Sequence, residues 1–424
     1  MSDSSIHTIV SREILDSRGN PTLETTVILA SGYRGTTSVP SGASVGKYEA
    51  LELRDHDEKR YNGMGVTKAV SIINTIIAPK LKGIDVFNQE NIDKIMISLD
   101  GTPDKKRLGA NSIISVSSAA CAAAAHLKNI PLYIYLHSLI PEIQNDKIQR
   151  IPAPIFNVIN GGRHGGGNVD FQEYFLIPAS NYSFSDALRI GVELYQNVKK
   201  LLIAKGLVHA VGDEGGFAPN VSTNMDPIEI LYEVIRTSPY RFGRDVFFGL
   251  DIAASTLIGE RGYSIKDRPV PYQTNEFITY LKNLHALYRL LILEDPFGED
   301  DWDGWTKINN ELGTEILIVG DDLLTTNPER LTMAIQKKAC GGILLKPNQI
   351  GTISEFIEVV SVAKNNSEKC IVSHRSGETN DTFIADMAVA VQAEYVKFGA
   401  PARGERVTKY NRLLEIEKEL MKSN

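Results

Sequence analysis

The sequence predicts an α/β protein in which a smaller α+β domain precedes a barrel of strands and helices. Three observations lead to this prediction. The first part of the chain places strands before helices, which is the order of an α+β unit. The remainder alternates apolar strands with helical segments. Six of those strands end on an ionisable residue, as strands do in parallel barrels whose catalytic groups sit at the carboxyl ends.

The N-terminal part begins with three expected strands. Residues 6–15 and 22–30 have strand patterns and are joined by the turn DSRGNP, and a third short strand around 33–39 leads into the loop PSGASVGK. Apolar spacing of helical type follows these strands. The predicted helices cover residues 66–77, 88–99 and 110–127.

The chain divides near residues 138–152, a stretch rich in proline and polar residues. A chain of 424 residues is too long for one ordinary domain. We therefore expect an N-terminal domain of residues 1–138 and a barrel domain of residues 139–424. In the second domain a helix is expected from Asp186, an acidic cap candidate, to Lys205, and it should stop at Gly206.

Each of the six apolar runs ends on a residue that can carry chemistry. Three end on acids, and the later three end on lysine or histidine, which suggests a metal site that faces an anionic substrate. The run-end residues are Asp251, Glu294, Asp321, Lys346, His374 and Lys397.

The three acids are the natural metal ligands. Asp251, Glu294 and Asp321 offer hard oxygen atoms without thiolates, which favours Mg²⁺ or Mn²⁺ over zinc. A single acid after a strand is usually a turn residue or a helix cap, but three in successive units favour a site. The neighbouring Asp295 and Asp322 are interpreted as caps or as supports of that site.

Two lysines end later strands of the same barrel. Facing carboxylates and a dication, Lys346 and Lys397 become a base or an anion clamp, whereas the alternative is a solvated surface group. A base lysine must be neutral, and nearby cations favour the neutral form. Pro347 keeps Lys346 extended, as a strand end requires.

A further group suggests anion binding and proton transfer. Arg375 and Ser376, beside His374, offer a fork and a hydroxyl donor for phosphate or carboxylate, although an incidental arginine in a loop remains the alternative. Glu173 and Glu214 stand at the ends of apolar segments. If the two carboxylates are close, one of their pKa values rises and a proton stays available; otherwise they are a cap and a surface acid.

Two glycine-rich loops are ambiguous. Residues 160–168 (NGGRHGGGN) carry Arg163 and His164 and, taken alone, favour a flexible surface turn. They lack the strand–helix context of a dinucleotide-binding loop. PSGASVGK could be a mobile lid whose Ser44 reaches a metal or a phosphate.

The composition excludes several classes. The net charge of −7 argues against nucleic acid or an anionic membrane as the main partner. Cys121, Cys340 and Cys370 are too few and too scattered for a disulfide framework or a zinc site, and they suit a reducing cytosol. No signal-peptide pattern is evident at the start. No apolar stretch is expected to span a membrane, and residues 119–125 are interpreted as a packed helix.

These stretches together resemble the enolases over the whole length of the chain. The blocks follow one another in order: SREILDSRGNPT, VPSGASVGKYEALELRD, NVINGG-x-H, VGDEGGFAPN, LEDPF, VGDDLLTTNP, LLKPNQIGT, VSHRSGET and GAPARGER-x-x-KYN. The resemblance implies a small α+β domain that caps a modified (β/α)8 TIM barrel. It also implies the reversible conversion of 2-phosphoglycerate to phosphoenolpyruvate and water with two Mg²⁺ ions, a lyase reaction of glycolysis and gluconeogenesis.

The resemblance also implies a role for each site residue. Asp251, Glu294 and Asp321 would hold the first Mg²⁺, and Ser44 would help to hold the second. Lys346 would remove the proton from carbon 2, and Lys397 would stabilise the resulting charge. The remaining roles are general acid for Glu214 with support from Glu173, phosphate binding for Arg375 and Ser376, and closure over the substrate or support of the acid for His164 and His374.

The sequence departs from the usual enolase pattern at positions that carry no metal ligand or proton-transfer group. These positions affect the lid, loop packing and the surroundings of Lys397. They are Val45, Gly167, Thr256, Pro347, Phe398 and Gly404.

Three alternatives stay open at this point: a superfamily dehydratase or racemase acting on another carboxylate, a Schiff-base lysine aldolase, and a catalytically silent scaffold or adhesin. The resemblance further implies a cytoplasmic homodimer, with an octamer as the alternative, although some enolases are also found at the cell surface or secreted.

Overall fold

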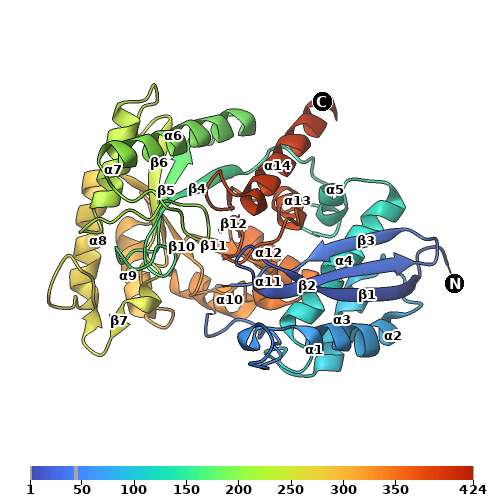
Figure 1. Ribbon diagram of the computed structural model, residues 1–424. Coiled ribbons are helices and arrows are strands. Elements are labelled where there is room, and N and C mark those ends of the chain that lie inside the picture. Colours follow the sequence, from blue (N-terminus) through green and yellow to red (C-terminus); the bar gives the residue numbers. More distant parts are fainter. Residues whose placement is uncertain (1, 43–45, 424) are drawn as a thin grey trace.

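The computed structural model describes residues 2–42 and 46–423 and places a small sheet with its helices beside a closed barrel (Figure 1). The small sheet is an antiparallel meander of three strands, which match the three predicted strands closely. Asp16 shapes the first turn, because its Oδ1 accepts the backbone N–H groups of Arg18 (2.8 Å) and Asn20 (2.9 Å). The strands are β1 (Ile6–Leu15), β2 (Pro21–Leu29) and β3 (Arg34–Ser38).

Helices follow this sheet, as predicted. The expected helix over 66–77 is interrupted by a π-helical turn and continues to Leu81, and Asn88 caps the next helix through the N–H of Asn91. The elements are η1 (Tyr61–Gly63), α1 (Thr67–Ile72), η2 (Ile73–Ile77), α2 (Ala78–Leu81), α3 (Gln89–Asp100), α4 (Ala110–Lys128) and α5 (Leu132–His137).

Helix α4 packs against the small sheet at very short range. A Cβ atom at Gly35 would lie 2.1 Å from the backbone nitrogen of Ala123, so the close approach requires glycine on β3 and small residues on α4. Contrary to the expectation from sequence, α4 is long and apolar enough to cross a membrane by length and composition. However, 89% of its apolar window is buried inside the protein, as in a core helix.

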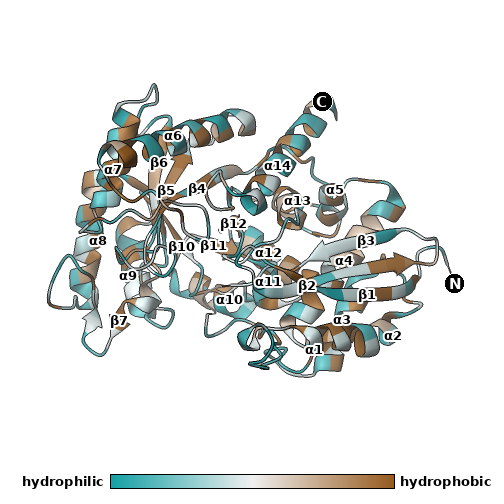
Figure 2. Ribbon diagram, viewed as in Figure 1, coloured by the Kyte–Doolittle hydropathy of each residue, from teal (hydrophilic) through white to brown (hydrophobic). Residues whose placement is uncertain are grey.

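The barrel is closed by eight strands in the order β10–β11–β12–β13–β4–β5–β6–β9. Its interior is filled by apolar side chains such as Ile155, Phe175 and Ile371, and Figure 2 shows the hydrophobic character of β5, β6 and the inner helix α13. The strands are β4 (Ala153–Asn160), β5 (Glu173–Pro178), β6 (Val246–Asp251), β9 (Leu290–Glu294), β10 (Leu317–Gly320), β11 (Gly342–Leu345), β12 (Lys369–Ser373) and β13 (Tyr395–Lys397).

One strand corrects the expectation of a wholly parallel barrel. Strand β5 runs antiparallel to both β4 and β6. The connection between β4 and β5, residues 161–172, contains no helix, whereas parallel neighbours are usually joined through one. The modified barrel that the resemblance implies fits this arrangement.

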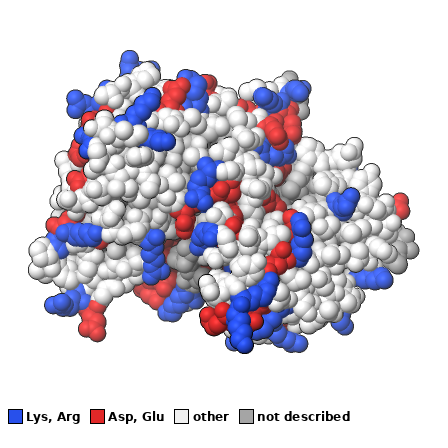
Figure 3. All heavy atoms as spheres, viewed as in Figure 1, with Lys and Arg blue, Asp and Glu red and all other residues white. Residues whose placement is uncertain are grey.

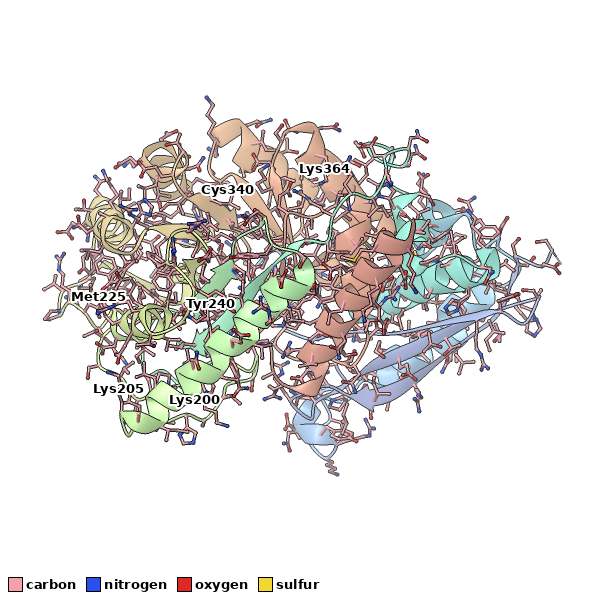
Figure 4. All side chains as sticks on the ribbon, turned by 90° about the horizontal axis from the view of Figure 1, so that it is seen from above. Lys200, Lys205, Met225, Tyr240, Cys340 and Lys364 are labelled. Atoms are coloured by element: carbon pink, nitrogen blue, oxygen red, sulfur yellow. The ribbon has the colours of Figure 1, made fainter. Side chains whose placement is uncertain are left out.

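The remaining helices surround the barrel. Helix α6 begins two residues before its predicted start because Ser183, not Asp186, is its N-cap. The helix ends before Gly206, as expected, and Gly206 has a positive φ of 67°. Figure 4 shows α6, labelled at Lys200, beside α14. The elements are α6 (Phe184–Ala204), α7 (Asp226–Arg236), η3 (Ala254–Thr256), β7 (Ile258–Gly259), β8 (Gly262–Tyr263), α8 (Thr274–Tyr288), α9 (Trp302–Leu312), α10 (Pro328–Lys337), α11 (Pro347–Ile350), α12 (Ile353–Asn365), α13 (Phe383–Ala390) and α14 (Gly404–Ser423).

The N-terminal elements are tied to the barrel by polar contacts. Ser41 and Gly377 exchange two backbone hydrogen bonds of 2.7 and 2.9 Å. The start of α12 is capped from the other side, because Asp93 accepts the N–H of Ser354 at 2.9 Å and Ser117 accepts that of Ile353 at 3.0 Å. The N-terminal part therefore sits close to the barrel mouth.

Candidate active site

All six predicted run-end residues lie at one end of the barrel. Strands β6, β9 and β13 end on Asp251, Glu294 and Lys397, while Asp321, Lys346 and His374 directly follow β10, β11 and β12. Most of these side chains are buried; Lys397, for example, is 3% exposed. A buried charge needs a partner, so their pairing determines what the site can do.

The reversed strand β5 delivers Glu173 to the same end. Glu173 is the first residue of β5, and its partner across the ladder is Asp251, the last residue of β6. An antiparallel strand starts where its neighbours end. The carboxylate therefore faces the barrel mouth although it precedes an apolar strand.

Lys397 lies among three carboxylates. Its Nζ is 3.0 Å from Glu173 Oε2, 3.3 Å from Asp251 Oδ2 and 2.8 Å from Glu294 Oε1. Burial opposes the charged form of the ammonium, but the acids, led by Glu173 and Glu294, raise the pKa of Lys397 well above its ordinary value. Lys397 is therefore a firmly charged group.

Lys346 forms an ion pair with Asp321. Burial lowers the pKa of Lys346, but Asp321 and other acids, among them Glu294, together raise it above its ordinary value. The neutral lysine expected of a base is thus not the state that this pairing favours. Arg375 and Lys397 act in the opposite direction, so the protonation of Lys346 depends on whether Asp321 remains its partner.

The acid end of the pocket is built from two glutamates and two histidines. His164 Nδ1 lies 3.3 Å from Glu173 Oε1 and 3.5 Å from Glu214 Oε1. Glu214 Oε2 is 3.4 Å from His374 Nε2 and accepts a hydrogen bond of 2.8 Å from Asn157. Sequence analysis did not identify Asn157, which lies in mid-strand of β4 without a distinguishing neighbour.

The close carboxylates have opposite pKa shifts. Burial and the neighbouring Glu214 raise the pKa of Glu173 to about 7. Burial would also raise that of Glu214, but His164 and His374 hold its pKa well below the ordinary value. The two pKa values are therefore split, and the proton is favoured on Glu173.

The two histidines differ in charge. Burial opposes ionisation of His164, but Glu214 and Glu173 raise its pKa to about 9. Burial lowers the pKa of His374 to about 4. Arg406 donates to His374 Nδ1 at 2.7 Å, so the neutral ring carries its hydrogen on Nε2, toward Glu214.

The anion-binding group is paired with a residue that sequence analysis missed. Arg375 donates to Glu49 Oε2 at 2.9 Å and to Glu49 Oε1 at 3.3 Å. Ser376 lies beside it and accepts a long hydrogen bond of 3.4 Å from Arg18. Glu49 lies in the stretch VPSGASVGKYEALELRD, but no local sequence pattern marks it as a site residue. Ser44 and Val45 lie outside the described residues.

Most of these residues, although not Glu294, line one pocket of about 560 Å³, together with Gln172, Thr256, Asp295 and Asp322. On the outer face shown in Figure 3, acidic and basic side chains are interspersed. The pocket itself is rich in carboxylates. Burial, with neighbouring acids, raises the pKa values of Glu294, Asp295 and Asp322, the last to about 7, which indicates negative charge that lysines do not fully neutralise.

Such a set of oxygen donors could hold metal ions. Within the described ranges, ligand atoms within 4.8 Å of one another occur in two groups, one formed by Asp295, Asp321 and Asp322 and the other by His164, Glu173 and Glu214. Among the described residues, the predicted ligand set overlaps these groups only at Asp321. Asp251 and Glu294 instead contact the ammonium of Lys397. Asp295 also fulfils its expected supporting role, since it accepts the N–H groups of Asp321 and Asp322.

Comparisons with known proteins agree with this architecture. Residues 6–136 match the family description "Enolase, N-terminal domain", and residues 148–424 match "Enolase, C-terminal TIM barrel domain". The chain is 47% identical over 420 residues to an enolase of Ehrlichia canis (strain Jake), covering 99% of this chain and 98% of that protein.

The chain belongs to the enolase family. The prediction of an enolase, a lyase that acts as a phosphopyruvate hydratase, is confirmed, as is its fold of a TIM barrel preceded by a smaller domain. The dehydratase or racemase and the silent scaffold are not favoured.

Several departures from the enolase pattern have a local explanation. Gly167 has φ = +78°, a conformation that suits glycine. Pro347 is the first residue of α11 and leaves Lys346 extended, with φ = −132°. Phe398 is buried against Tyr410, with ring centroids 6.0 Å apart. Thr256 lines the pocket, and its hydroxyl bonds to the carbonyl of Ala253.

Proposed function

We propose that this enolase converts 2-phosphoglycerate to phosphoenolpyruvate with Lys346 as the base and Glu214 as the general acid. The observation that carries the proposal is the meeting of Lys346, Lys397, Glu214 and Arg375 in one pocket. A base, an acid, a charge-stabilising ammonium and an anion-binding fork are the groups that this elimination needs.

The metal ligands are assigned from the oxygen donors of the pocket. Asp251, Glu294 and Asp321 would hold one Mg²⁺, and Ser44 would contribute to a second, with Mn²⁺ as a substitute. Dications held there would supply positive charge beside the substrate carboxylate. The surplus of buried carboxylates supports this assignment.

Lys346 takes the proton from carbon 2. The ion pair with Asp321 favours the charged lysine. A metal held by Asp321 would share the charge of this carboxylate, and Arg375 and Lys397 would then favour the neutral lysine. Lys397 remains charged and stabilises the enolate-like intermediate.

Glu214 protonates the departing hydroxide. Its proton comes from the group formed with Glu173 and His164, which holds protons near neutral pH. His374 orients Glu214 through its Nε2 hydrogen and helps to enclose the substrate together with His164. Arg375 and Ser376 bind the phosphate.

We further propose a cytoplasmic homodimer, with an octamer as the alternative, and a division of the chain into residues 1–138 and 139–424. The partner is a small phosphorylated three-carbon substrate, and the negative net charge argues against nucleic acid. Both lysines are paired with carboxylates, and this pairing gives no support to the alternative of a Schiff-base aldolase.

The test is ultraviolet absorbance of the purified protein mixed with 2-phosphoglycerate. We expect a rise from the conjugated product with Mg²⁺ and no rise after addition of excess chelator. A rise that persists in chelator would contradict the metal assignment. Trapping of a substrate adduct by borohydride would instead support the aldolase.

A further inference from the structure

Glu49 brings a carboxylate from the N-terminal part of the chain into the barrel pocket. Its side chain is only 5% exposed, and both of its oxygens accept hydrogen bonds from Arg375. This two-point contact is the geometry that the guanidinium fork also offers to a phosphate. Asn348 Oδ1 accepts a further hydrogen bond from Arg375 Nη1 at 3.3 Å.

The cations of the pocket share a pattern. Lys397 and Lys346 are paired with carboxylates that the proposed function assigns to metal or proton chemistry. Arg375 is paired with Glu49, which belongs to neither group. The role of Glu49 must therefore follow from its contact with Arg375.

Glu49 does not depend on Arg375 alone. Its Oε1 also accepts the N–H of Gly46 at 2.9 Å and the side-chain amide of Gln349 at 3.3 Å. If Arg375 is taken by another anion, Oε1 keeps these two neutral donors, whereas Oε2 gives up its hydrogen bond from Arg375. Release of Arg375 therefore costs the contact at Oε2 but leaves Oε1 bonded.

We propose that Glu49 is an internal counter-anion that holds Arg375 in the free enzyme and yields it to the phosphate of the substrate. This proposal rests on the proposed phosphate role of Arg375. Glu49 lowers the affinity for phosphate, because an arriving phosphate must displace a carboxylate and approach its negative charge. It is a positioning residue that sets KM for the phosphorylated substrate.

The test is calorimetric titration with inorganic phosphate in the presence of chelator. Glu49→Gln keeps the shape and the Oε1 acceptor but removes the charge. We expect it to tighten phosphate binding about tenfold, the scale of one charge-assisted hydrogen bond, and to lower KM for 2-phosphoglycerate without raising kcat. The matched control is Glu13→Gln, because Glu13 pairs with Arg60 in the same N-terminal part of the chain and does not line the pocket. It should change phosphate affinity little.

Arg375→Gln, which removes the charge, separates this proposal from the phosphate role of Arg375. If it leaves phosphate affinity unchanged, Arg375 is not the phosphate site, and both that role and the present proposal fall, whereas the elimination is tested by the absorbance assay. If it weakens binding but Glu49→Gln leaves it unchanged or weaker, Glu49 is a static support and only the present proposal is overturned. Should Glu49→Gln not fold, Glu49→Asp is used. It retains the charge but cannot span the fork, and we expect about threefold tighter binding, whereas no tightening overturns the proposal.

Discussion

At the scale of single residues, the pocket is governed by pairing. Lys397 and Arg375 are buried cations, Lys346 is a partly buried one, and each is held by at least one carboxylate. Because a buried charge without a partner costs several kcal/mol, each pair fixes a protonation state as well as a position. The chemistry of the site therefore depends on which partner a metal or substrate removes.

Lys346→Ala should abolish turnover and leave the fold intact. The proposed base is lost, and general acid–base groups contribute about 10² to 10⁴ in rate, so we expect a fall of kcat of at least about 10²-fold. Initial rates and circular dichroism measure the two effects. The control is Lys200→Ala on the exposed side of α6, which should retain full activity. An active, folded Lys346→Ala protein would remove Lys346 from the mechanism.

Asp321→Asn should raise the Mg²⁺ concentration needed for half-maximal activity by about tenfold or more, since a charged ligand becomes neutral. The measurement is a metal titration of initial rate. Asp303→Asn, on the surface helix α9, is the control. An unchanged titration for Asp321→Asn would exclude Asp321 from the metal site.

At the scale of elements, two features hold the mouth in shape. The reversal of β5 places Glu173 opposite Asp251. Helix α14 secures the loop after β12, because Lys409 Nζ lies 2.8 Å from Glu378 Oε2 and Arg406 donates to the carbonyls of Arg375 and Ser376. The anion-binding loop is thus fixed by a distant helix.

The Glu378–Lys409 pair should make stability depend on pH. Burial would raise the pKa of Glu378, but Lys409 and Arg406 lower it below the ordinary 4.5. Its stabilisation is therefore present above pH 4.5 and is lost as the pH falls through the lowered folded pKa. Glu378→Gln should reduce the free energy of unfolding by about 3 kcal/mol at pH 7.

Denaturant unfolding at pH 7 and at pH 3.5 to 4 measures this effect. The difference between the wild-type protein and Glu378→Gln should shrink at the lower pH. Glu415→Gln, an exposed partner of Arg412 on the same helix, should cost less than about 1 kcal/mol. A difference that is constant with pH would show that the carboxylate charge is not responsible.

At the scale of the whole molecule, the N-terminal part and the barrel complete each other. Asp93 of α3 is fully buried and caps α12 by accepting the N–H and the hydroxyl of Ser354. Glu49 reaches the pocket from the same side. The active site therefore requires both parts to be docked.

Asp93→Ala should weaken this docking by about 2 kcal/mol. Both tryptophans, Trp302 and Trp305, lie in α9 of the barrel, so their fluorescence reports the barrel, whereas circular dichroism reports all helices. We expect circular dichroism to change before fluorescence in a denaturant titration of this variant. Asn327→Ala, which removes a cap within the barrel, should keep the two transitions coincident. Coincident transitions in Asp93→Ala would contradict a docking role.

Much of the fold could be predicted because its signals are local. The strands of the small sheet, the helices over 88–99 and 110–127, and the six run-end residues depend on alternation, spacing and flanking residues, which are properties of neighbouring positions. The reversal of β5 could not be predicted, since strand direction depends on the partner strand. The predicted N-cap of α6 was wrong because Ser183 and Asp186 are both residue types that favour this position.

The sequence by itself determined the family, the reaction and the set of chemical groups at the barrel mouth, because residue types in ordered blocks carry that information. Only the tertiary structure decided how these groups are paired: Lys397 with three carboxylates, Lys346 with Asp321, and Arg375 with Glu49. These partners are far apart in the chain, and their pKa values follow from distance and burial. Neither quantity is a property of the sequence until the chain has folded.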